Sequence, residues 1–323
     1  MGGTQPPTVA DLGEDALVAA ITERLRSAAP PARPDDVLVG PGDDAAVVAV
    51  ADGRVVVTTD VLVEGRHFRR DWSGGRDVGA RAAAANLADI AAMGAVPTAL
   101  VVGLAVPADA TVAWVLELAD GLGEEVAAAG ATVVGGDVVR SSVLALSVTA
   151  LGSLEGRDPV LRSGASAGDL VAVAGRLGWA AAGFAVLSRG FRSPRVLVDA
   201  HRRPAPPYAE GPRAATLGAT AMVDVSDGLA RDLGHVAAAS GVAVALASEA
   251  FHVPNELRDT ARALTTDPLH WLLGGGDDHA LAACFPPEVD LPMAWSVVGR
   301  VQAGEGVLVD GSPWTGPAGW TAF

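Results

Sequence analysis

The segment from Gly42 to Phe68, GDDAAVVAVADGRVVVTTDVLVEGRHF, contains the pattern that decides the predicted fold. Two short valine-rich runs, Ala45–Val50 and Arg54–Thr59, flank the pair Asp52-Gly53. An Asp-Gly pair between such runs predicts a β-hairpin, because both residues tolerate a positive φ angle. The segment therefore predicts a pair of antiparallel strands.

Carboxylates stand at both ends of this predicted hairpin. Asp44 precedes the first run, and Asp60 follows Thr58 and Thr59 at the end of the second. If the two runs pair, Asp44 and Asp60 lie close together at the open end, where they repel each other unless a cation lies between them. The segment predicts either a metal site built on a hairpin or ordinary acids at a solvated strand end.

The composition of the 323 residues indicates a globular protein of two domains or one large domain, because 50% are hydrophobic and 19% are charged. The formal net charge is −15, which argues against nucleic acid or an anionic membrane as the main partner. Every basic side chain other than histidine is arginine. The absence of lysine excludes a P-loop and any Schiff base.

The chain contains no apolar run long enough to span a membrane, and its first residues lack the basic and apolar regions of a signal peptide. Its single cysteine, Cys284, excludes an intrachain disulfide. We therefore expect a cytoplasmic protein.

Helical and strand patterns alternate along the chain. Helices are predicted at Glu14–Ala29, Arg76–Met93, Asp109–Ala129, Trp179–Ser188 and Asp227–Ala239, with Asp109 as an N-cap. Strands are predicted at Thr98–Ala105, Ala131–Val134, Ser142–Leu151, Asp169–Ala174, Ala221–Val225, Val242–Ala247, Ala280–Phe285 and Trp295–Arg300, with a last hairpin around Asp310-Gly311. Because hairpins are mixed among the alternating elements, the expected class is α+β with mixed sheets. A stretch without a clear helix or strand pattern begins at Gly152, so we expect domains at residues 1–152 and 153–323.

Four further segments place acids beside turns or on a helix. On the predicted helix, Asn86 and Asp89 share a face, which is either a narrow solvated stripe or a face turned toward a metal. Gly135-Gly136-Asp137 follows a buried strand and is either a phosphate-binding and metal-binding turn or a tight turn with an incidental acid. Asp224-Val-Ser-Asp227 joins a strand to a helix that Asp227 would cap, and Gly274–His279 is a glycine-rich loop with two acids.

These segments supply oxygen ligands almost exclusively, which favours Mg²⁺, Mn²⁺ or Ca²⁺ over zinc. Two like charges about 4 Å apart cost roughly 4 kcal/mol at an effective dielectric constant of about 20. An acidic protein can therefore bring two phosphorylated molecules together only if metal ions carry the positive charge. Several Mg²⁺ ions beside a polyphosphate are the leading interpretation.

In combination, TTDVLVEGRHF (58–68), NLADIAAMGA (86–95) and DVSDGLARDLGH (224–235) resemble the thiamine-monophosphate kinase family, within the group of ATP-binding enzymes that includes aminoimidazole ribonucleotide synthetase. The resemblance implies a homodimer of two-domain subunits whose N-terminal sheets join into a dimeric β-barrel. It implies ATP-dependent transfer of the γ-phosphate to thiamine phosphate, giving thiamine diphosphate.

The resemblance also implies roles for individual residues. Magnesium ligands are expected at Asp44, Thr58, Thr59, Asp60, Asp89, Asp137, Asp224 and Asp227. ATP contacts are expected at Gly136, Asp137, Arg162 and Ser226, and thiamine phosphate contacts at His67, Asp277 and Trp320. The acceptor is a phosphate oxygen that is already anionic, so no general base is expected and catalysis reduces to positioning and charge neutralisation by Mg²⁺.

The sequence departs from the family pattern in the glycine-rich loop, where G-G-E-D-Y-E-L is usual and residues 275–281 read GGDDHAL. Val138 also replaces the usual Thr after G-G-D. Another enzyme of the same group and a non-catalytic nucleotide-binding relative are the alternatives. Selenophosphate synthetase would need a reactive N-terminal Cys or selenocysteine, and the hydrogenase-maturation relative would need a C-terminal Cys. Neither is present.

Overall fold

The computed structural model of the chain describes residues 6–28, 36–40, 45–317 and 319. Internal contacts divide the chain into two compact units. Unit 1 comprises Met1–Ile90 and Pro97–Ser153, and unit 2 comprises Ala91–Val96 and Leu154–Phe323. Within the described ranges, none of the helices combines the length and the apolar content needed to cross a membrane.

Unit 1 is built on a four-stranded sheet with the strand order β3-β6-β4-β5. Its strands are β3 (Val56–Val63), β4 (Val96–Val106), β5 (Thr132–Arg140) and β6 (Ala145–Ser153), of which β3 and β6 are antiparallel and β4 and β5 parallel. The helices are α1 (Val9–Leu12), α2 (Glu14–Ala28), α3 (Gly75–Ala92) and α4 (Val112–Ala128). A separate two-stranded sheet joins β1 (Val37–Val39) to β2 (Val47–Val48).

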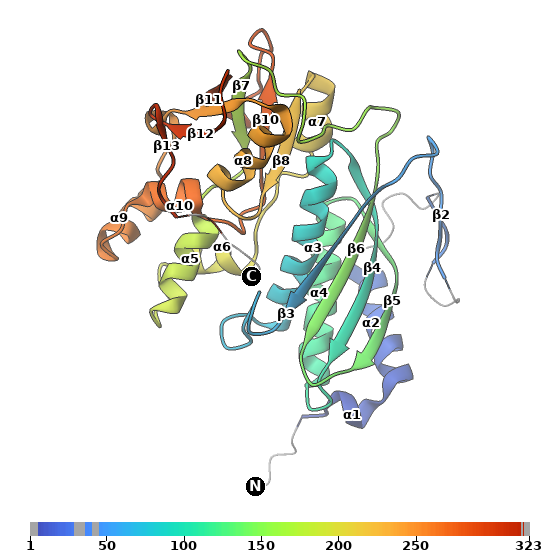
Figure 1. Cartoon of the computed structure of the whole chain (residues 1–323). Coiled ribbons are helices and arrows are strands. Elements are labelled where there is room, and N and C mark those ends of the chain that lie inside the picture. The colour runs from blue at the N-terminus through green and yellow to red at the C-terminus, as the bar shows by residue number, and fades with distance from the viewer. Residues whose placement is uncertain (1–5, 29–35, 41–44, 318, 320–323) are drawn as a thin grey trace. The chain divides into compact units, whose positions relative to one another are not determined.

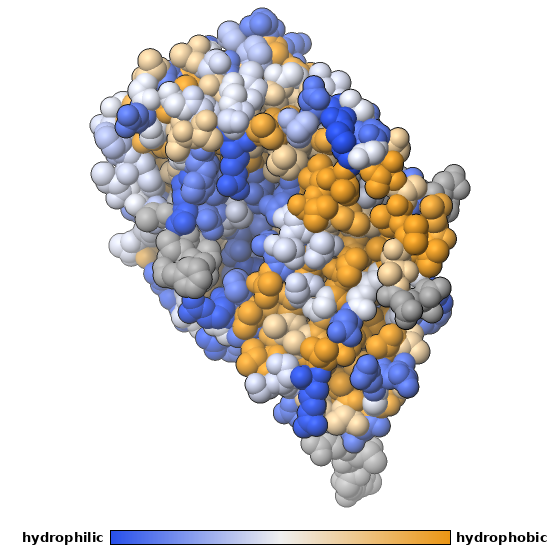
Figure 2. Space-filling view, turned by 45° about the vertical axis from the view of Figure 1, so that its right-hand side comes forward, coloured by the Kyte–Doolittle hydropathy of each residue, from blue (hydrophilic) through white to orange (hydrophobic). Residues whose placement is uncertain are grey.

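The two faces of the four-stranded sheet differ in burial. Figure 1 shows helices α3 and α4 lying on one face. Leu146, Val148 and Ala150, alternate residues of β6, are fully buried, as expected for the face that meets the helices. On the opposite face Val57 and Val61 of β3 are more than half exposed. Figure 2 shows hydrophobic residues gathered at the surface in the region of this sheet.

Helices α3 and α4 approach each other through glycines. A Cβ added at Gly79 of α3 would collide with the backbone oxygen of Leu118 of α4, and one added at Gly121 would collide with that of Arg76. Only glycine leaves room for so close a contact between two helix backbones. The sequence signal for this packing is the small-residue character of α3.

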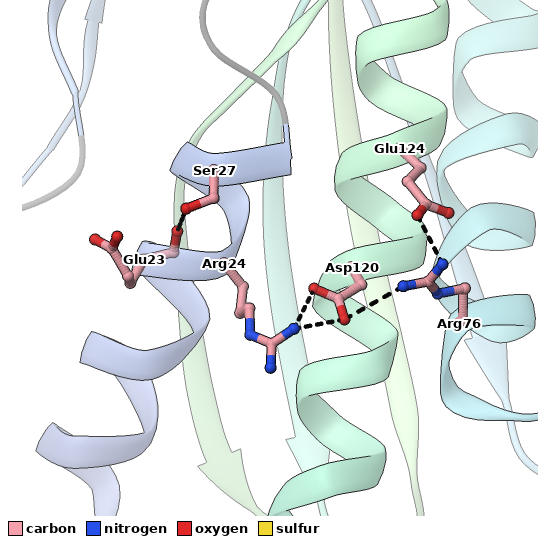
Figure 3. A network of polar contacts seen from close by, with 6 residues as sticks. All are labelled: Glu23, Arg24, Ser27, Arg76, Asp120 and Glu124. Atoms are coloured by element: carbon pink, nitrogen blue, oxygen red, sulfur yellow. Dashed lines mark hydrogen bonds and ion pairs between the residues drawn. The ribbon is translucent and has the colours of Figure 1, made fainter.

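A network of arginines and carboxylates ties α2, α3 and α4 together on the surface (Figure 3). Arg24 of α2 donates to both carboxylate oxygens of Asp120 of α4, at 3.0 and 2.8 Å. Arg76 of α3 lies 3.6 Å from the Asp120 carboxylate and 2.9 Å from that of Glu124. Each pair is partly exposed and contributes little alone, but Asp120 of α4 contacts both Arg24 and Arg76 and so links the three helices.

Unit 2 is built on a seven-stranded mixed sheet with the order β13-β12-β9-β11-β7-β10-β8. Its strands are β7 (Leu170–Ala174), β8 (Ala221–Val225), β9 (Ala243–Leu246), β10 (Ala280–Phe285), β11 (Trp295–Gln302), β12 (Gly306–Val309) and β13 (Ser312–Pro313). Its helices are α5 (Trp179–Ser188), α6 (Arg195–Arg202), α7 (Glu210–Leu217), α8 (Leu229–Ser240), α9 (Asn255–Ala263) and α10 (Pro268–Gly274), with a 3₁₀ turn at Ser248–Ala250. The β9–β12 pair is parallel and the other pairs are antiparallel. The expected α+β class with mixed sheets is confirmed.

The predicted hairpin around Asp52-Gly53 is wrong. The chain does turn there, with Gly53 at φ +73°, but the two flanking strands pair elsewhere. β2 pairs with β1, and β3 pairs along its whole length with β6. The continuous β3–β6 ladder and its buried face give β3 a longer partner than the short run before the turn could provide.

Two other local predictions are corrected. Thr111, and not Asp109, is the N-cap of α4, since the Thr111 hydroxyl accepts from Trp114 N–H at 3.3 Å. Gly135-Gly136-Asp137 is not a turn after a short strand but part of β5, which continues to Arg140 beyond a register shift. The last hairpin is confirmed, with Asp310 and Gly311 at φ +50° and +80° between β12 and β13.

The four-stranded sheet of unit 1 is open, with β3 and β5 as its edges. The described residues of the single chain therefore form no closed barrel.

Candidate active site

In unit 1, strand β3 and helix α3 bring four of the polar residues together. Thr58 Oγ1 donates to Asp89 Oδ2 at 2.8 Å, and the backbone N–H of Asp60 donates to Asn86 Oδ1 at 3.0 Å. Asn86 is fully buried, and its amide nitrogen donates to the backbone oxygen of Ala82 at 3.0 Å. The alternative of a solvated stripe is therefore wrong for Asn86, whose amide fixes the backbone at Asp60.

Thr59 points to the opposite face of the sheet from Thr58, as neighbouring strand residues must. Its hydroxyl donates to the backbone oxygen of Val148 at 3.0 Å and lies 3.2 Å from the hydroxyl of Thr149. The structure therefore separates Thr59 from the group formed by Thr58, Asp60 and Asp89.

Asp137 lies on β5, at the sheet edge opposite to β3. Two strands intervene, so at about 4.8 Å per strand the two edges are about 14 Å apart. The Asp137 carboxylate is exposed and accepts from Val138 N–H at 2.9 Å. At Gly136 an added Cβ would collide with the backbone oxygen of Val102 on β4. Within a single copy of the chain, the structure of unit 1 does not bring Asp137 close to Asp60.

His67 follows the far end of β3. Its Nδ1 accepts from the backbone N–H of Val63 at 3.0 Å, which fixes the ring against the strand. Val63 is five residues beyond Thr58, or about 16 Å along an extended strand. The segment from Thr58 to His67 thus leads away from Asp89.

In unit 2, the glycine-rich loop lies along the end of β8. Asp277 N–H donates to the backbone oxygen of Ser226 at 2.9 Å, and a Cβ at Gly276 would collide with that same oxygen. Asp224, which is 3% exposed, has its Oδ2 3.1 Å from His279 Nδ1. The structure therefore brings Asp224, Ser226 and Asp277 together, and it adds His279.

Asp227 precedes α8 but does not cap it. The cap position is Gly228, and Asp232 Oδ2 accepts from the N–H groups of Asp227 and Gly228 at 3.1 and 3.0 Å. The Asp227 carboxylate instead lies 3.2 Å from Nε of Arg231. Burial raises the pKa of Asp227, and the charge of Arg231 opposes that shift.

Asp232 is a functional candidate that the sequence reasoning missed. It is buried, and burial together with the charge of Asp224 raises its pKa to about 7, against the lowering effect of its two backbone hydrogen bonds. The sequence does contain a signal for Asp232, which is an acid in the first turn of a helix that begins directly after a glycine. The free N–H groups at such a helix start need an acceptor.

Arg162 lies away from Ser226 in unit 2. Its backbone oxygen accepts from the hydroxyl of Ser240, the last residue of α8, at 3.3 Å. Asp227 stands at the other end of this 12-residue helix, which is about 18 Å long. Two other predicted site residues, Asp44 and Trp320, lie outside the described residues.

The donor set fits a hard divalent cation in kind, because the brought-together groups are carboxylate, hydroxyl and amide oxygens. The predicted magnesium ligands that the structure describes are divided between the units. Unit 1 contains Thr58, Thr59, Asp60, Asp89 and Asp137, and unit 2 contains Asp224 and Asp227. Among the described residues, no group of three or more His, Cys, Asp or Glu side chains is placed to hold a metal ion.

Comparison with known proteins identifies the family. Residues 42–154 match the family described as "AIR synthase related protein, N-terminal domain". The thiamine-monophosphate kinase of Mycobacterium tuberculosis is 50% identical over 322 residues, which cover 99% of this chain and 94% of that protein. The chain belongs to the thiamine-monophosphate kinase family.

Solved structures of this family have the same fold. The thiamine-monophosphate kinase of Stenotrophomonas maltophilia aligns with a TM-score of 0.78 at 33% identity, covering 91% of this chain and 97% of that one. A structure described as AaThiL complexed with AMPPCP and TMP aligns with a TM-score of 0.79 at 32% identity, covering 100% of both chains. The expected aminoimidazole ribonucleotide synthetase-like architecture is confirmed at the level of the subunit fold.

Proposed function

We propose that this protein transfers the γ-phosphate of ATP directly to thiamine phosphate and forms thiamine diphosphate in the cytoplasm. The observation that carries the proposal is the 50% identity to a thiamine-monophosphate kinase across 99% of the chain. The alignment with AaThiL, a relative complexed with AMPPCP and TMP, over the full length of both chains supports it.

We assign the magnesium-binding role to Thr58, Thr59, Asp60, Asp89, Asp137, Asp224 and Asp227, with Asp44 as a further ligand. Bound Mg²⁺ would supply positive charge to the phosphate groups beside these carboxylates. In unit 1, Thr58 and Asn86 hold Asp89 and the Asp60 backbone in place. In unit 2, His279 and Arg231 contact Asp224 and Asp227.

We assign ATP contacts to Gly136, Asp137, Arg162 and Ser226, and contacts to thiamine phosphate to His67, Asp277 and Trp320. A phosphate oxygen needs no deprotonation to attack, so no residue is assigned as a general base. The task of the chain is to align donor and acceptor and to exclude water.

We further propose that two copies assemble through the open sheet of unit 1. The face of β3 that carries Val57 and Val61 has exposed apolar side chains, and among the described residues no strand pairs with the outer side of β3 or of β5. Joining β5 of one copy to β3 of a second copy closes the two sheets into a barrel and removes the edges. This assembly also places the partner's Asp137 at the strand that carries Asp60, which explains why one copy alone keeps them at opposite edges.

A purified-protein assay with ATP, Mg²⁺ and thiamine phosphate tests the proposed function. We expect thiamine diphosphate to form and Asp60→Asn to reduce kcat by at least about 100-fold, because the variant loses a carboxylate ligand of the Mg²⁺ that would neutralise the transferring phosphate. Asp71→Asn, which removes an exposed acid paired with Arg69 in the same unit, serves as the matched control. Intact ATP binding without thiamine diphosphate formation would contradict the proposal, and so would near-normal turnover of Asp60→Asn at saturating Mg²⁺.

A further inference from the structure

We infer that His279 is a positioning residue that holds the carboxylate of Asp224 in the orientation in which it binds a divalent cation. The inference deepens the proposed function and rests on it, because it takes Asp224 as a magnesium ligand. It assigns a role to a residue at which the chain departs from the G-G-E-D-Y-E-L pattern of its family, since His279 stands where that pattern has Tyr.

The contact between the two side chains is short and buried. His279 Nδ1 lies 3.1 Å from Asp224 Oδ2, and the side chains of His279 and Asp224 are 8% and 4% exposed. A carboxylate in such a place is costly unless a donor or a cation satisfies it. With its proton on Nδ1, the imidazole donates a hydrogen bond to Oδ2. This bond fixes the orientation of the carboxylate, so the other oxygen, Oδ1, faces a set direction in which a second partner can bind.

The loop that carries His279 is held at several points. His279 N–H donates to the backbone oxygen of Val225 at 3.0 Å, which places the imidazole beside the strand that carries Asp224. The carboxylate of Asp278 accepts from Ala180 N–H at 2.9 Å and so ties the loop to the start of α5. Asp277 and His279 both have positive φ, at +66° and +51°.

A positive φ is unfavourable for residues other than glycine, and such a conformation persists only when the surrounding contacts impose it. Two such residues within three positions are held by the loop's backbone hydrogen bonds, from Asp277 N–H to Ser226 and from His279 N–H to Val225. In this conformation the imidazole of His279 reaches Asp224. Partners of ligating side chains commonly set metal affinity in this way, and their loss costs about 10-fold to 100-fold.

Manganese titration of the nucleotide-free protein, followed by electron paramagnetic resonance, tests the inference without depending on activity. His279→Leu removes the donor at similar volume and should raise the Kd for Mn²⁺ at least about 10-fold. His279→Asn should restore most of the affinity, because its amide nitrogen is attached to Cγ as Nδ1 is and Asn tolerates positive φ. His201→Leu, which removes a buried histidine of α6, should leave the Kd unchanged.

Asp224→Asn separates failure of the inference from failure of the proposed function. If Asp224→Asn leaves the Kd for Mn²⁺ unchanged, the assignment of Asp224 as a metal ligand fails, and the inference fails with it. If Asp224→Asn weakens Mn²⁺ binding but a folded His279→Leu variant binds as the wild type does, only the inference is overturned.

A spectroscopic measurement on the wild-type chain covers the case in which His279→Leu does not fold. With ¹⁵N-labelled histidine, the signal of His279 should show a proton on Nδ1. The signal of His67 is the internal contrast, because its Nδ1 accepts from Val63 N–H and a neutral ring then carries its proton on Nε2. An unprotonated Nδ1 at His279 would overturn the inference.

Discussion

Among individual residues, the buried carboxylates of unit 2 differ in what satisfies them. Asp224 has His279, and Asp232 has two backbone N–H groups. Asp278 accepts from Ala180 N–H through Oδ1, while its buried Oδ2 has no hydrogen-bond partner in the described part of the chain. Burial raises the pKa of Asp278 to about 7, against the lowering effect of the Ala180 hydrogen bond.

Asp278 therefore makes the stability of the protein depend on pH. Between the unfolded value of 3.8 and the folded value of about 7, the folded state retains a proton that the unfolded state has lost. The free energy of unfolding should fall as the pH rises through this range, by about 1.4 kcal/mol per pH unit for this one group. The stabilisation is complete below pH 3.8 and is lost above about pH 7.

Asp278→Asn should abolish this contribution, because the amide oxygen still accepts from Ala180 N–H and carries no charge. Denaturant unfolding at pH 5 and pH 8 checks this prediction. The free energy of unfolding of the variant minus that of the wild type should be more positive at pH 8 than at pH 5. Asp290→Asn, at an exposed acid on the same unit, is the control. Equal differences between Asp278→Asn and wild type at both pH values would contradict the prediction.

Among the elements, the spacing of α3 and α4 is set by glycine rather than by large side chains. Gly79 has the backbone of Leu118 where its Cβ would be. Gly79→Ala should therefore force the helices apart and destabilise the protein by about 2–3 kcal/mol.

The matched control is Gly234→Ala in α8, where nothing lies within 4 Å of the added methyl group. This change should raise stability by about 0.5–1 kcal/mol, because alanine loses less backbone freedom in a helix. Thermal unfolding of both variants gives the comparison, and equal midpoints would show that the α3–α4 contact tolerates a methyl group.

At the scale of the whole molecule, the open sheet of unit 1 and the separation of Asp60 from Asp137 point to the same arrangement. In the proposed dimer each metal site uses Asp60 of one copy and the partner's Asp137. Asp60→Asn and Asp137→Asn subunits should each be inactive alone. Mixed by unfolding and refolding together, they should recover about a quarter of wild-type activity, because half of the dimers are mixed and each mixed dimer keeps one intact pair.

Sedimentation velocity of the wild-type chain and of each variant is the control for this experiment, since all three must form dimers for the mixing to be informative. Two results would contradict the arrangement. One is a monomeric wild-type chain with full activity, and the other is a mixture of dimeric variants that remains as inactive as its components.

The sequence by itself determined the α+β class, most helices and strands, and the family. Helices and strands such as Trp179–Ser188 and Ala221–Val225 were predicted to the residue because local periodicity and flanking glycines define them. The motifs around Asp60, Asp89 and Asp224 were visible because oxygen-bearing residues beside glycine form recognisable local patterns.

Only the tertiary structure decided which of these local patterns pair with one another. The Asp52-Gly53 turn is real, yet its flanking strands pair with β1 and β6, since pairing depends on which partner offers the longer buried ladder. Residues that act through a distant segment were likewise hidden from the sequence. Asn86 fixes Asp60 across 26 positions, and His279 meets Asp224 across 55. Spacing along a chain indicates helix faces and strand faces, but contacts between distant segments arise only when the packed core brings their backbones together.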